Sequence, residues 1–339
     1  MNDNFIRVSI IGVGYWGPNI IRNFISNAST IVDSICDIRQ ERIDAIRKIY
    51  QFLNATRDYR EIVHSNSNDL VAICTPVFTH YEIAKEALEA GKHILLTKPM
   101  TSTTVQAEEL VNLAEKKGLQ IFVDHTFMYH GAVRKIKQLL QNGEIGDLYY
   151  FDSVRVNLGL FQHDVNVVWD LAPHDISIMF YLLDRYPECV VATGADHFGT
   201  GLEDMAYLTV YFPNNLIAHI HVNWLSPVKI RQTLIAGSKK MVVWDDNEPS
   251  EKVRIYDKGI EIVQTTDKVY DILIQYRTGD MYCPKIDTKE ALSVEVDDIV
   301  ASLKNGSVPI SDGKVGLMIV KILEAAQYSI KNRGKEVRI

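Results

Sequence analysis

The sequence is poor in the features that mark disulfide-rich, membrane-spanning or secreted proteins. Its 339 residues contain only four cysteines, Cys36, Cys74, Cys189 and Cys283, and no CxxC pair. A disulfide framework is therefore not expected. No apolar run is long enough to cross a bilayer, and the polar start from Met1 to Asn4 has no signal-peptide pattern. These absences predict a cytoplasmic protein with reduced thiols and no membrane partner.

Basic tracts, internal repeats and low-complexity segments are also missing. Asp and Glu number 43 against 36 Lys and Arg, which gives a net charge of −7. This balance argues against nucleic acid as a main partner. The composition is 47% hydrophobic and 23% charged, as in globular proteins, and the length exceeds what one ordinary core needs. We therefore expect two domains.

The first 125 residues alternate apolar strands with amphipathic helices, the pattern of a doubly wound parallel sheet. One helix is expected to begin at Thr79, because Thr79-x-x-Glu82 has capping-box spacing, and another spans about 103–117. The predicted strands are 5–11, 31–36, 69–74, 93–97 and 120–124. We expect residues 1–125 to form a dinucleotide-binding Rossmann domain of the α/β class.

The alternation of short strands and helices ends near residue 126, where long strands with alternating apolar and polar residues begin. Alternation of this kind is typical of a largely antiparallel sheet with one face covered and the other open to a partner. The predicted strands are 148–156, 189–197, 205–212, 216–224 and 231–243, and the predicted helices are 131–141, 170–183, 289–304 and 313–332. Residues 126–339 are thus expected to form an α+β domain for substrate binding and oligomerisation.

A glycine turn between the first strand and the first helix indicates the cofactor. Gly12, Gly14 and Gly17 have the GxGxxG spacing, and Asp37 follows the second strand. Such glycines permit a tight turn, close approach of the backbone to a pyrophosphate and close helix–strand packing. The helix opening at Tyr15 and Trp16 would present amides to the phosphates.

The acid after the second strand indicates which dinucleotide binds. Asp37 would accept hydrogen bonds from the adenosine ribose and would repel a 2′-phosphate, which favours NAD over NADP. Arg39 and Arg42 follow closely in the sequence and could relieve that repulsion. NAD is therefore the expected cofactor, with NADP as the alternative.

Two constellations carry the expected chemistry. Lys98, followed by Pro99, comes at the carboxyl end of the predicted strand 93–97, where the nicotinamide lies in a nucleotide-binding fold. Asp170 and His174 are four residues apart and would share a helix face, so that the carboxylate orients the imidazole. The alternative, in which Asp170 caps the helix and His174 is a core histidine, stays open at this point.

The remaining histidines give little reason to expect a metal. His219 and His221 alternate on one predicted strand without a third ligand nearby in the sequence, and hydride transfer to a nicotinamide needs no metal. His163, Asp164 and His174 could converge, but no metal site is predicted. The segment 159–166 is interpreted as a substrate-facing loop or as an ordinary connection between a strand and a helix.

Taken together, these motifs resemble the Gfo/Idh/MocA family of sugar oxidoreductases over nearly the whole chain. The most specific segments are GVGYWGPN (12–19), CTPVFTH (74–80), Thr97–Pro99 and NLGLFQHDVNVVWDLAPH (157–174). The resemblance implies a Rossmann domain followed by an α/β domain with an open sheet, which forms homodimers or homotetramers in that family.

The resemblance also implies roles for individual residues. Lys98 matches the lysine that contacts the reacting hydroxyl, and His174 with Asp170 matches the acid/base pair. Thr97 stands where many members carry glutamate, so it brings no negative charge toward Lys98. The implied cofactor-lining residues are Thr75, Pro76, His80 and Thr97, and the implied substrate-binding residues are Asn157, Gln162 and His163.

The expected function is NAD-dependent hydride transfer between a sugar hydroxyl or ketone and nicotinamide. The resemblance points to nucleotide sugars, with a UDP-N-acetylglucosamine-type 3-dehydrogenase as the first hypothesis. The alternatives are an NADP-dependent 3-ketoreductase of a TDP-deoxysugar, an inositol or free-sugar dehydrogenase, and a non-enzymatic dinucleotide sensor. A sensor would need the glycine turn but not Lys98, Asp170 and His174 together.

Overall fold

The computed structural model describes residues 5–159, 165–264 and 272–339, without the side chains of 261–276. Its internal contacts divide the chain into two compact units. The first comprises Met1–Tyr129 and Lys289–Glu324, and the second comprises His130–Thr288 and Ala325–Ile339. Among the described residues, none of the helices combines the length and apolar character that a membrane span requires.

The first unit is built on a six-stranded parallel sheet with the order β3-β2-β1-β4-β5-β6. The chain starts in the middle of this sheet, because β1 pairs with β2 on one side and β4 on the other. The order therefore reverses at β1/β4, where ligands bind in doubly wound folds. The strands are β1 (Ile6–Ile11), β2 (Thr30–Cys36), β3 (Asn54–Thr56), β4 (Leu70–Ile73), β5 (His93–Thr97) and β6 (Ile121–Asp124). The predicted fold class is confirmed.

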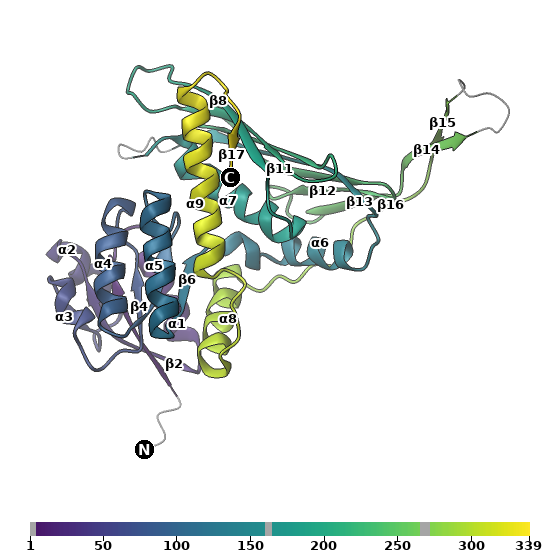
Figure 1. The fold of residues 1–339 in the computed structure, drawn as a ribbon. Helices are drawn as coiled ribbons and strands as arrows, with labels where there is room; N and C mark the ends of the chain where they lie inside the picture. Colours follow the sequence, from purple (N-terminus) through teal and green to yellow (C-terminus); the bar gives the residue numbers. More distant parts are fainter. Residues whose placement is uncertain (1–4, 160–164, 265–271) are drawn as a thin grey trace. The chain divides into compact units, whose positions relative to one another are not determined.

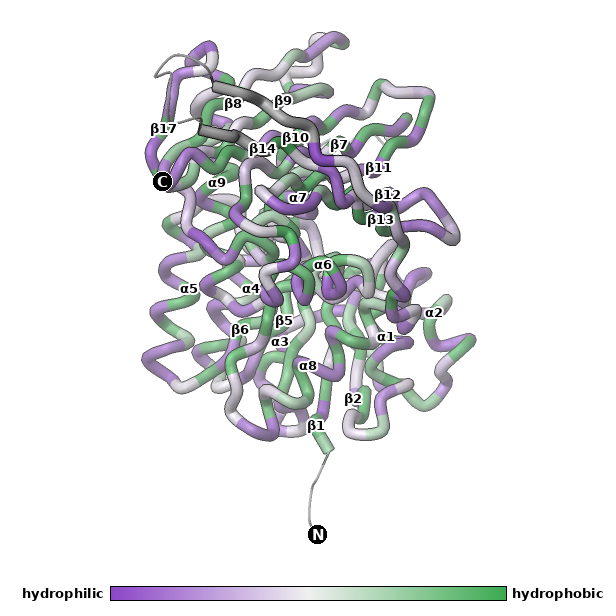
Figure 2. Tube along the Cα trace, turned by 90° about the vertical axis from the view of Figure 1, so that its right-hand side faces the viewer, coloured by the Kyte–Doolittle hydropathy of each residue, from purple (hydrophilic) through white to green (hydrophobic). Residues whose placement is uncertain are grey.

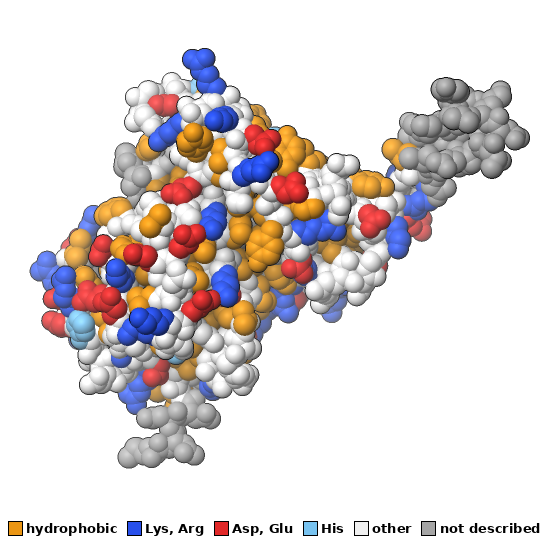
Figure 3. Space-filling view, in the orientation of Figure 1, with side chains coloured by type: hydrophobic (Ala, Val, Ile, Leu, Met, Phe, Trp, Pro, Cys, Tyr) orange, Lys and Arg blue, Asp and Glu red, His pale blue; other side chains and the backbone are white. Residues whose placement is uncertain are grey.

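Amphipathic helices surround this sheet. In Figure 2, α5 alternates between hydrophobic and hydrophilic along its length; its buried stripe includes Leu110 and Val111, and it ends at Gly118 with φ 66°. Figure 3 shows acidic and basic side chains intermixed over the helices in view. The helices of this unit are α1 (Gly17–Ser26), α2 (Gln40–Ile49), α3 (Tyr59–Val63), α4 (Val77–Glu89), α5 (Thr104–Lys117), the short 3-10 turn η1 (Thr126–Tyr129) and α8 (Ala291–Asn305).

The division of the chain differs from the predicted boundary at residues 125 and 126, because α8 returns to the first unit. Leu292, Val296 and Ile299 of α8 are buried in the same apolar cluster as Ile20 and Phe24 of α1. A helix with such a stripe lowers the free energy of folding only where it finds a matching apolar surface. The first unit is therefore discontinuous in sequence.

The second unit contains a nine-stranded sheet of order β16-β13-β12-β11-β7-β10-β9-β8-β17. Its pairs are antiparallel except β7 with β10, as expected for an open, largely antiparallel sheet. The strands are β7 (Leu148–Leu158), β8 (Cys189–Ala195), β9 (Met205–Tyr211), β10 (Ile217–Asn223), β11 (Leu225–Gly237), β12 (Met241–Asp245), β13 (Val253–Tyr256), β16 (Met281–Tyr282) and β17 (Val337–Arg338).

Helices lie against this sheet, and a hairpin extends from it. Helix α7 (Val167–Leu183) contacts β7, β9 and β10, while α6 (Gly131–Gln141) packs on α7. Helix α9 (Gly313–Lys331) contributes residues to both units, because the division falls after Glu324. The hairpin of β14 (Gly259–Gln264) and β15 (Ile272–Arg277) projects from the end of the sheet that carries β16 (Figure 1).

Two predicted elements need correction. The strand expected over 231–243 is two strands, because the chain reverses at Ser238 and Lys239 and the Gly237 amide donates to the Lys240 carbonyl at 3.0 Å. Helix α4 begins at Val77 rather than at Thr79. The Thr79 hydroxyl lies in the first turn and bonds to the Thr75 hydroxyl and the Pro76 carbonyl, so it does not form a capping box.

Candidate active site

The glycine turn at the carboxyl end of β1 has no room for side chains at two of its three glycines. Gly12 has φ +92°, and a Cβ there would lie 2.6 Å from the Cys74 carbonyl oxygen. A Cβ on Gly17 would overlap the carbonyl oxygen of Gly12. The close packing of β1, α1 and the end of β4 therefore requires these two glycines.

Helix α1 starts from this turn without a side-chain cap. Trp16 occupies the N-cap position, and no described side chain accepts a hydrogen bond from the first-turn amides. Tyr15, which precedes it, is 89% exposed. Pro18 has no amide hydrogen, and the Asn19 amide donates to the Trp16 carbonyl at 2.9 Å. The positive end of a helix dipole without a capping side chain suits an anionic group, so the turn fits the pyrophosphate of a dinucleotide.

Asp37 at the end of β2 is joined to the glycine turn. Its carboxylate accepts the amides of Val13 and Arg39, each at 3.0 Å, and lies 3.5 Å from Nη1 of Arg42. The same Arg42 nitrogen is 3.1 Å from the position of a Cβ on Gly14. The acid predicted to select the adenosine ribose and the neighbouring arginine thus lie at the edge of the turn.

His80 connects the loops that follow β4 and β5. Its Nε2 lies 2.8 Å from the Thr75 carbonyl oxygen, and its Nδ1 lies 3.1 Å from that of Pro99 and 3.3 Å from that of Met100. The side chain is 1% exposed, and burial lowers its pKa despite these contacts. His80 therefore faces backbone carbonyls, and it holds the segment that carries Lys98 and Pro99.

Thr97, the departure from the family pattern, faces the same histidine. Its Oγ1 is 3.4 Å from Nε2 of His80 and 3.4 Å from the Ile73 carbonyl oxygen. The hydroxyl thus takes part in the connection between β4 and β5. Lys98 follows, half-buried, at the carboxyl end of β5, and its peptide bond to Pro99 is cis.

His125, which the sequence reasoning missed, lies near Lys98. Burial and, second, the charge of Lys98 lower the pKa of His125 to about 3. Neither of its ring nitrogens has a hydrogen-bond partner among the described residues, although the side chain is 1% exposed. His125 directly follows β6, and the other candidate residues follow β4 and β5. This position at a strand's carboxyl end could have identified His125 as a candidate from the sequence.

In the second unit, α7 carries Asp170 and His174 one turn apart on one face. The helix begins at Val167, and the Asn166 side chain caps it by accepting the Trp169 amide at 3.1 Å. The alternative in which Asp170 is the cap is therefore wrong. Pro173 lies in the interior of the helix.

Asp170 is instead held from the neighbouring sheet. The indole Nε1 of Trp224, just beyond the end of β10, donates to Oδ2 of Asp170 at 3.2 Å. Trp224 is 1% exposed and packs against Gly159, where a Cβ would overlap the indole ring. No local pattern predicts this contact, because Asp170 and Trp224 are distant along the chain.

A buried ion pair fixes α7 on the sheet directly beside His174. Nε of Arg155 donates to Oδ2 of Asp175 at 2.6 Å, and the Ser153 hydroxyl donates to Oδ1 at 2.7 Å. Both charged side chains are at most 5% exposed. Because paired and hydrogen-bonded charges tolerate burial, the pair defines where α7 lies on β7.

The expected substrate-binding residues are described only in part. Asn157 lies near the end of β7 and is partly exposed. It is two residues before Gly159, the residue on which Trp224 packs. Gln162 and His163 lie outside the described residues. Among the residues that are described, no three His, Cys, Asp or Glu side chains converge as metal ligands. His219 and His221 both stack on Tyr207.

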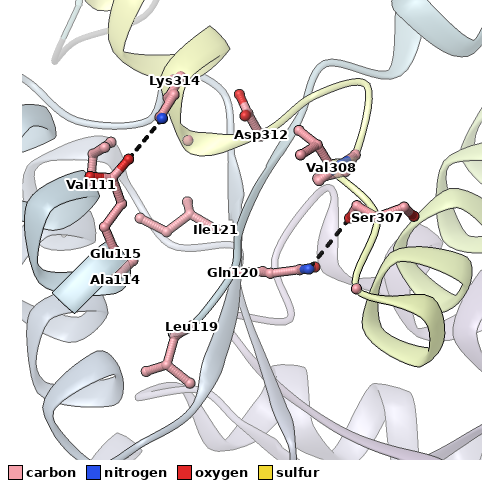
Figure 4. Close-up of a pocket in the computed structure, with 13 residues that line it drawn as sticks. Val111, Ala114, Glu115, Leu119, Gln120, Ile121, Ser307, Val308, Asp312 and Lys314 are labelled. Atoms are coloured by element: carbon pink, nitrogen blue, oxygen red, sulfur yellow. Dashed lines mark hydrogen bonds and ion pairs between the residues drawn. The ribbon is translucent and has the colours of Figure 1, made fainter. Parts of the chain in front are cut away.

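A shallow pocket of about 220 Å³ in the first unit is not the cofactor site. It lies at the amino end of β6, beside Gln120 and Ile121, whereas the glycine turn and Lys98 follow the carboxyl ends of strands. Figure 4 shows Gln120 directed at Ser307 on one side and the Lys314–Glu115 ion pair on the other. A dinucleotide needs a larger site.

The uncapped helix after a glycine turn, with an acid at the end of β2, defines the first unit as a dinucleotide-binding Rossmann unit. Comparison with protein families agrees. Residues 6–125 match the oxidoreductase family with an NAD-binding Rossmann fold, and residues 133–243 match the Gfo/Idh/MocA C-terminal domain. The chain belongs to the Gfo/Idh/MocA family of oxidoreductases, and the expectation of an NAD-binding enzyme is confirmed.

Characterised relatives are distant but span the chain. The UDP-N-acetylglucosamine 3-dehydrogenase of Acidithiobacillus ferrooxidans is 24% identical over 325 residues, covering 93% of this chain and 94% of the relative. The myo-inositol 2-dehydrogenase of Thermotoga maritima is 21% identical over 345 residues, covering 97% of both.

Solved structures show the same fold. The UDP-N-acetylglucosamine 3-dehydrogenase GnnA from Acidithiobacillus ferrooxidans has a TM-score of 0.80 at 21% identity, with 97% of this chain and 98% of that one covered. GenD2 from gentamicin A biosynthesis, in complex with NAD, has a TM-score of 0.82 at 18% identity, with 99% and 97% covered.

Proposed function

We propose that this oxidoreductase transfers a hydride between a sugar carbinol and NAD, and that its substrate is a nucleotide sugar. The observation that carries the proposal is the placement of Asp170 and His174 one turn apart on α7, with Asp170 held by Trp224. A dinucleotide sensor would have no use for an oriented carboxylate–imidazole pair. This favours catalysis over the sensor alternative.

In the proposed mechanism, His174 takes the hydroxyl proton of the sugar on a ring nitrogen while Asp170 stabilises the resulting imidazolium. Lys98 donates a hydrogen bond to the oxygen on which negative charge develops. When bound, NAD supplies the acceptor for the hydride. In the reverse direction, His174 returns its proton to the oxygen of the reduced carbon.

The glycine turn would hold the pyrophosphate through the first amides of α1, and Asp37 would accept the ribose hydroxyls. Two amides orient the Asp37 carboxylate, so a 2′-phosphate placed beside it would be repelled. Arg42 offsets part of that repulsion. NAD is therefore proposed over NADP.

A UDP-N-acetylglucosamine-type sugar oxidised at C3 is the proposed substrate. The support is the resemblance of the segments 12–19 and 157–174 to enzymes of nucleotide-sugar metabolism and the coverage of a relative with that activity. The inositol dehydrogenase among the relatives supports the second candidate, a free polyol.

We also propose that the chain forms a homodimer or homotetramer through the open face of the second sheet. Tyr207, Tyr211 and Ile217 are 37–39% exposed there and alternate with buried residues of β9 and β10. Sedimentation velocity tests this directly, and a monomer at micromolar concentration would contradict it.

The test of the proposed reaction is reduction of NAD, followed at 340 nm, with UDP- and TDP-linked sugars, free sugars and inositols as substrates. The wild type is expected to reduce NAD with one class, and His174→Ala to lose at least about a hundredfold in kcat with little change in NAD affinity. Unchanged turnover in His174→Ala would remove its acid/base role. A free polyol as the best substrate would favour the second candidate.

A further inference from the structure

Two buried carboxyl groups meet next to the glycine turn of the first unit. Asp124 ends β6 and is 4% exposed, and Glu295 lies on α8 and is 1% exposed. The two groups are within hydrogen-bonding contact of each other. The mechanism proposed above uses neither of them, so the reason for burying two acids together needs an explanation.

The donors around the pair show where the charge lies. Asp124 accepts a hydrogen bond on each oxygen, from Nε1 of Trp16 and from the hydroxyl of Thr126. Neither oxygen of Glu295 accepts one from the described residues. An ionised Asp124 satisfies its two donors, whereas an ionised Glu295 would face a second negative charge with no donor.

The proton shared by the pair therefore resides on Glu295. Burial, the charge of Asp124 and the charge of Asp298 raise the pKa of Glu295 well above its usual range. As a neutral carboxylic acid, Glu295 donates its O–H to Asp124, and each of the two groups then has a partner.

We propose that Glu295 is a positioning residue for the dinucleotide, because its carboxylic acid group orients Asp124 and Asp124 in turn holds the Trp16 indole in the glycine turn. Trp16 is the N-cap residue of α1 and immediately precedes Gly17, where a Cβ would overlap the Gly12 carbonyl oxygen. The carbonyl of Trp16 also accepts the Asn19 amide at 2.9 Å, so the position of Trp16 bears on the first turn of α1. The inference rests on the proposed binding of NAD by this turn.

Two substitutions distinguish the effect of the hydrogen bond that Glu295 donates from the effect of its side-chain packing. Glu295→Gln keeps the shape and supplies an amide N–H to Asp124, so the Kd for NADH is expected to stay within about twofold of wild type. Glu295→Leu removes the donor and is expected to raise the Kd about tenfold or more. Asp297→Asn, on the same helix but about half exposed, is the control and leaves the Kd unchanged.

A third variant tests whether Glu295 acts through Trp16. Trp16→Phe removes the indole N–H that Asp124 accepts while it keeps an aromatic ring. In that background, Glu295→Leu is expected to have little further effect on the Kd, because the connection is already broken. An equal additional rise in the Kd would show that Glu295 affects binding by another route and would overturn the proposal.

The pH dependence of NADH binding provides a readout that packing alone would not change. Besides Asp124, the groups that face Glu295 are Asp298 on its own helix and Tyr129 of η1, whose phenol stays neutral because burial raises its pKa well above 10. Deprotonation of Glu295, as the pH rises through its raised pKa, places two charges side by side. Wild-type affinity is expected to fall there, while Glu295→Gln keeps its affinity over the same range.

Binding is measured by NADH fluorescence on the full chain, with circular dichroism to confirm that each variant is folded. If the wild type fails to bind NADH, the proposed function fails. If the wild type binds but Glu295→Leu binds equally well, or if Glu295→Gln is as weak as Glu295→Leu, then only the positioning role of Glu295 is overturned.

Discussion

Nε1 of Trp224 donates a hydrogen bond to Oδ2 of Asp170 at 3.2 Å, so a residue at the end of β10 holds an acid on α7. The bond engages one of the two carboxylate oxygens of Asp170. Because Asp170 and His174 share a helix face, the orientation of the carboxylate bears on the basicity of the imidazole. Trp224 is thus a positioning residue for the proposed acid/base pair.

Replacement of Trp224 by Phe removes this donor and keeps an aromatic ring. We expect kcat to fall about tenfold, with the affinity for NAD unchanged, because Asp170 loses its fixed orientation. Steady-state kinetics with the substrate found in the screen measure the change. Trp244→Phe is the matched control, since Trp244 is equally buried on β12; an equal loss of kcat in both variants would contradict the role.

Gly12→Ala tests the close packing of the glycine turn. The new Cβ would lie 2.6 Å from the Cys74 carbonyl oxygen at a φ of +92°, so backbone atoms must move. We expect the variant to lose measurable NAD binding and to unfold at lower urea concentration. Gly118→Ala is the control: its φ is also positive, at +66°, but nothing lies within 4 Å, so it costs only about 1–2 kcal/mol.

The control separates steric overlap from backbone conformation. Gly118 caps α5 at a distance from the turn, so its substitution is expected to leave the Kd for NAD unchanged. Equal losses of stability in the two variants would show that the Cys74 carbonyl moves aside at no cost and that the turn is less tightly packed than its geometry indicates.

Asp175→Asn tests the ion pair that holds α7 on the sheet. The substitution leaves the Arg155 guanidinium buried without its counter-charge, which is expected to cost about 3–5 kcal/mol of unfolding free energy. Equilibrium urea unfolding measures this loss. Asp287→Asn removes an acid from a half-exposed pair with Arg134 in the same unit and is expected to cost less than about 1 kcal/mol.

His125 makes the stability of the protein depend on pH. Its pKa is about 3 in the folded chain against 6.5 when unfolded, so between these values the unfolded state binds the extra proton. The folded state is therefore expected to lose about 2–3 kcal/mol from this group as pH falls from 6.5 to 4.5. Comparison of urea unfolding for wild type and His125→Phe over this range isolates that loss.

The His125→Phe variant is also expected to be at least as stable as wild type at pH 7, because it removes two buried nitrogens that have no partner among the described residues. His64, whose side chain is 60% exposed, provides the control. In His64→Phe the unfolding free energy is expected to vary with pH as it does in wild type. If the unfolding free energy varied with pH equally in wild type and His125→Phe, water would have to reach His125.

The sequence predicted those parts of the site that depend on local order along the chain. Gly12, Gly14 and Gly17 lie where their spacing places them, and Asp37 meets the turn because parallel strands end at the same edge of the sheet. Asp170 and His174 share a face because they are four residues apart. In each case the geometry follows from the spacing of residues within one segment or from a single strand–helix connection.

The contacts that sequence reasoning missed join residues from distant segments. Asp124 and Glu295, Trp224 and Asp170, and Arg155 and Asp175 come together only after the sheets and helices pack. A local sequence pattern also led to a wrong prediction where its hydroxyl group bonds to the backbone in a different way. Thr79 has the spacing of a cap, but α4 starts two residues earlier, and the Thr79 hydroxyl bonds to Pro76 in the first turn.

The return of α8 to the first unit has a consequence for biosynthesis. During translation the whole six-stranded sheet emerges before Leu292, Val296 and Ile299, which complete the apolar cluster around Phe24. A nascent chain that ends before α8 is therefore expected to expose the apolar face of α1, and such exposed surfaces favour aggregation and chaperone binding. The nucleotide-binding unit is therefore complete only after residues 130–288 of the second unit have been synthesised.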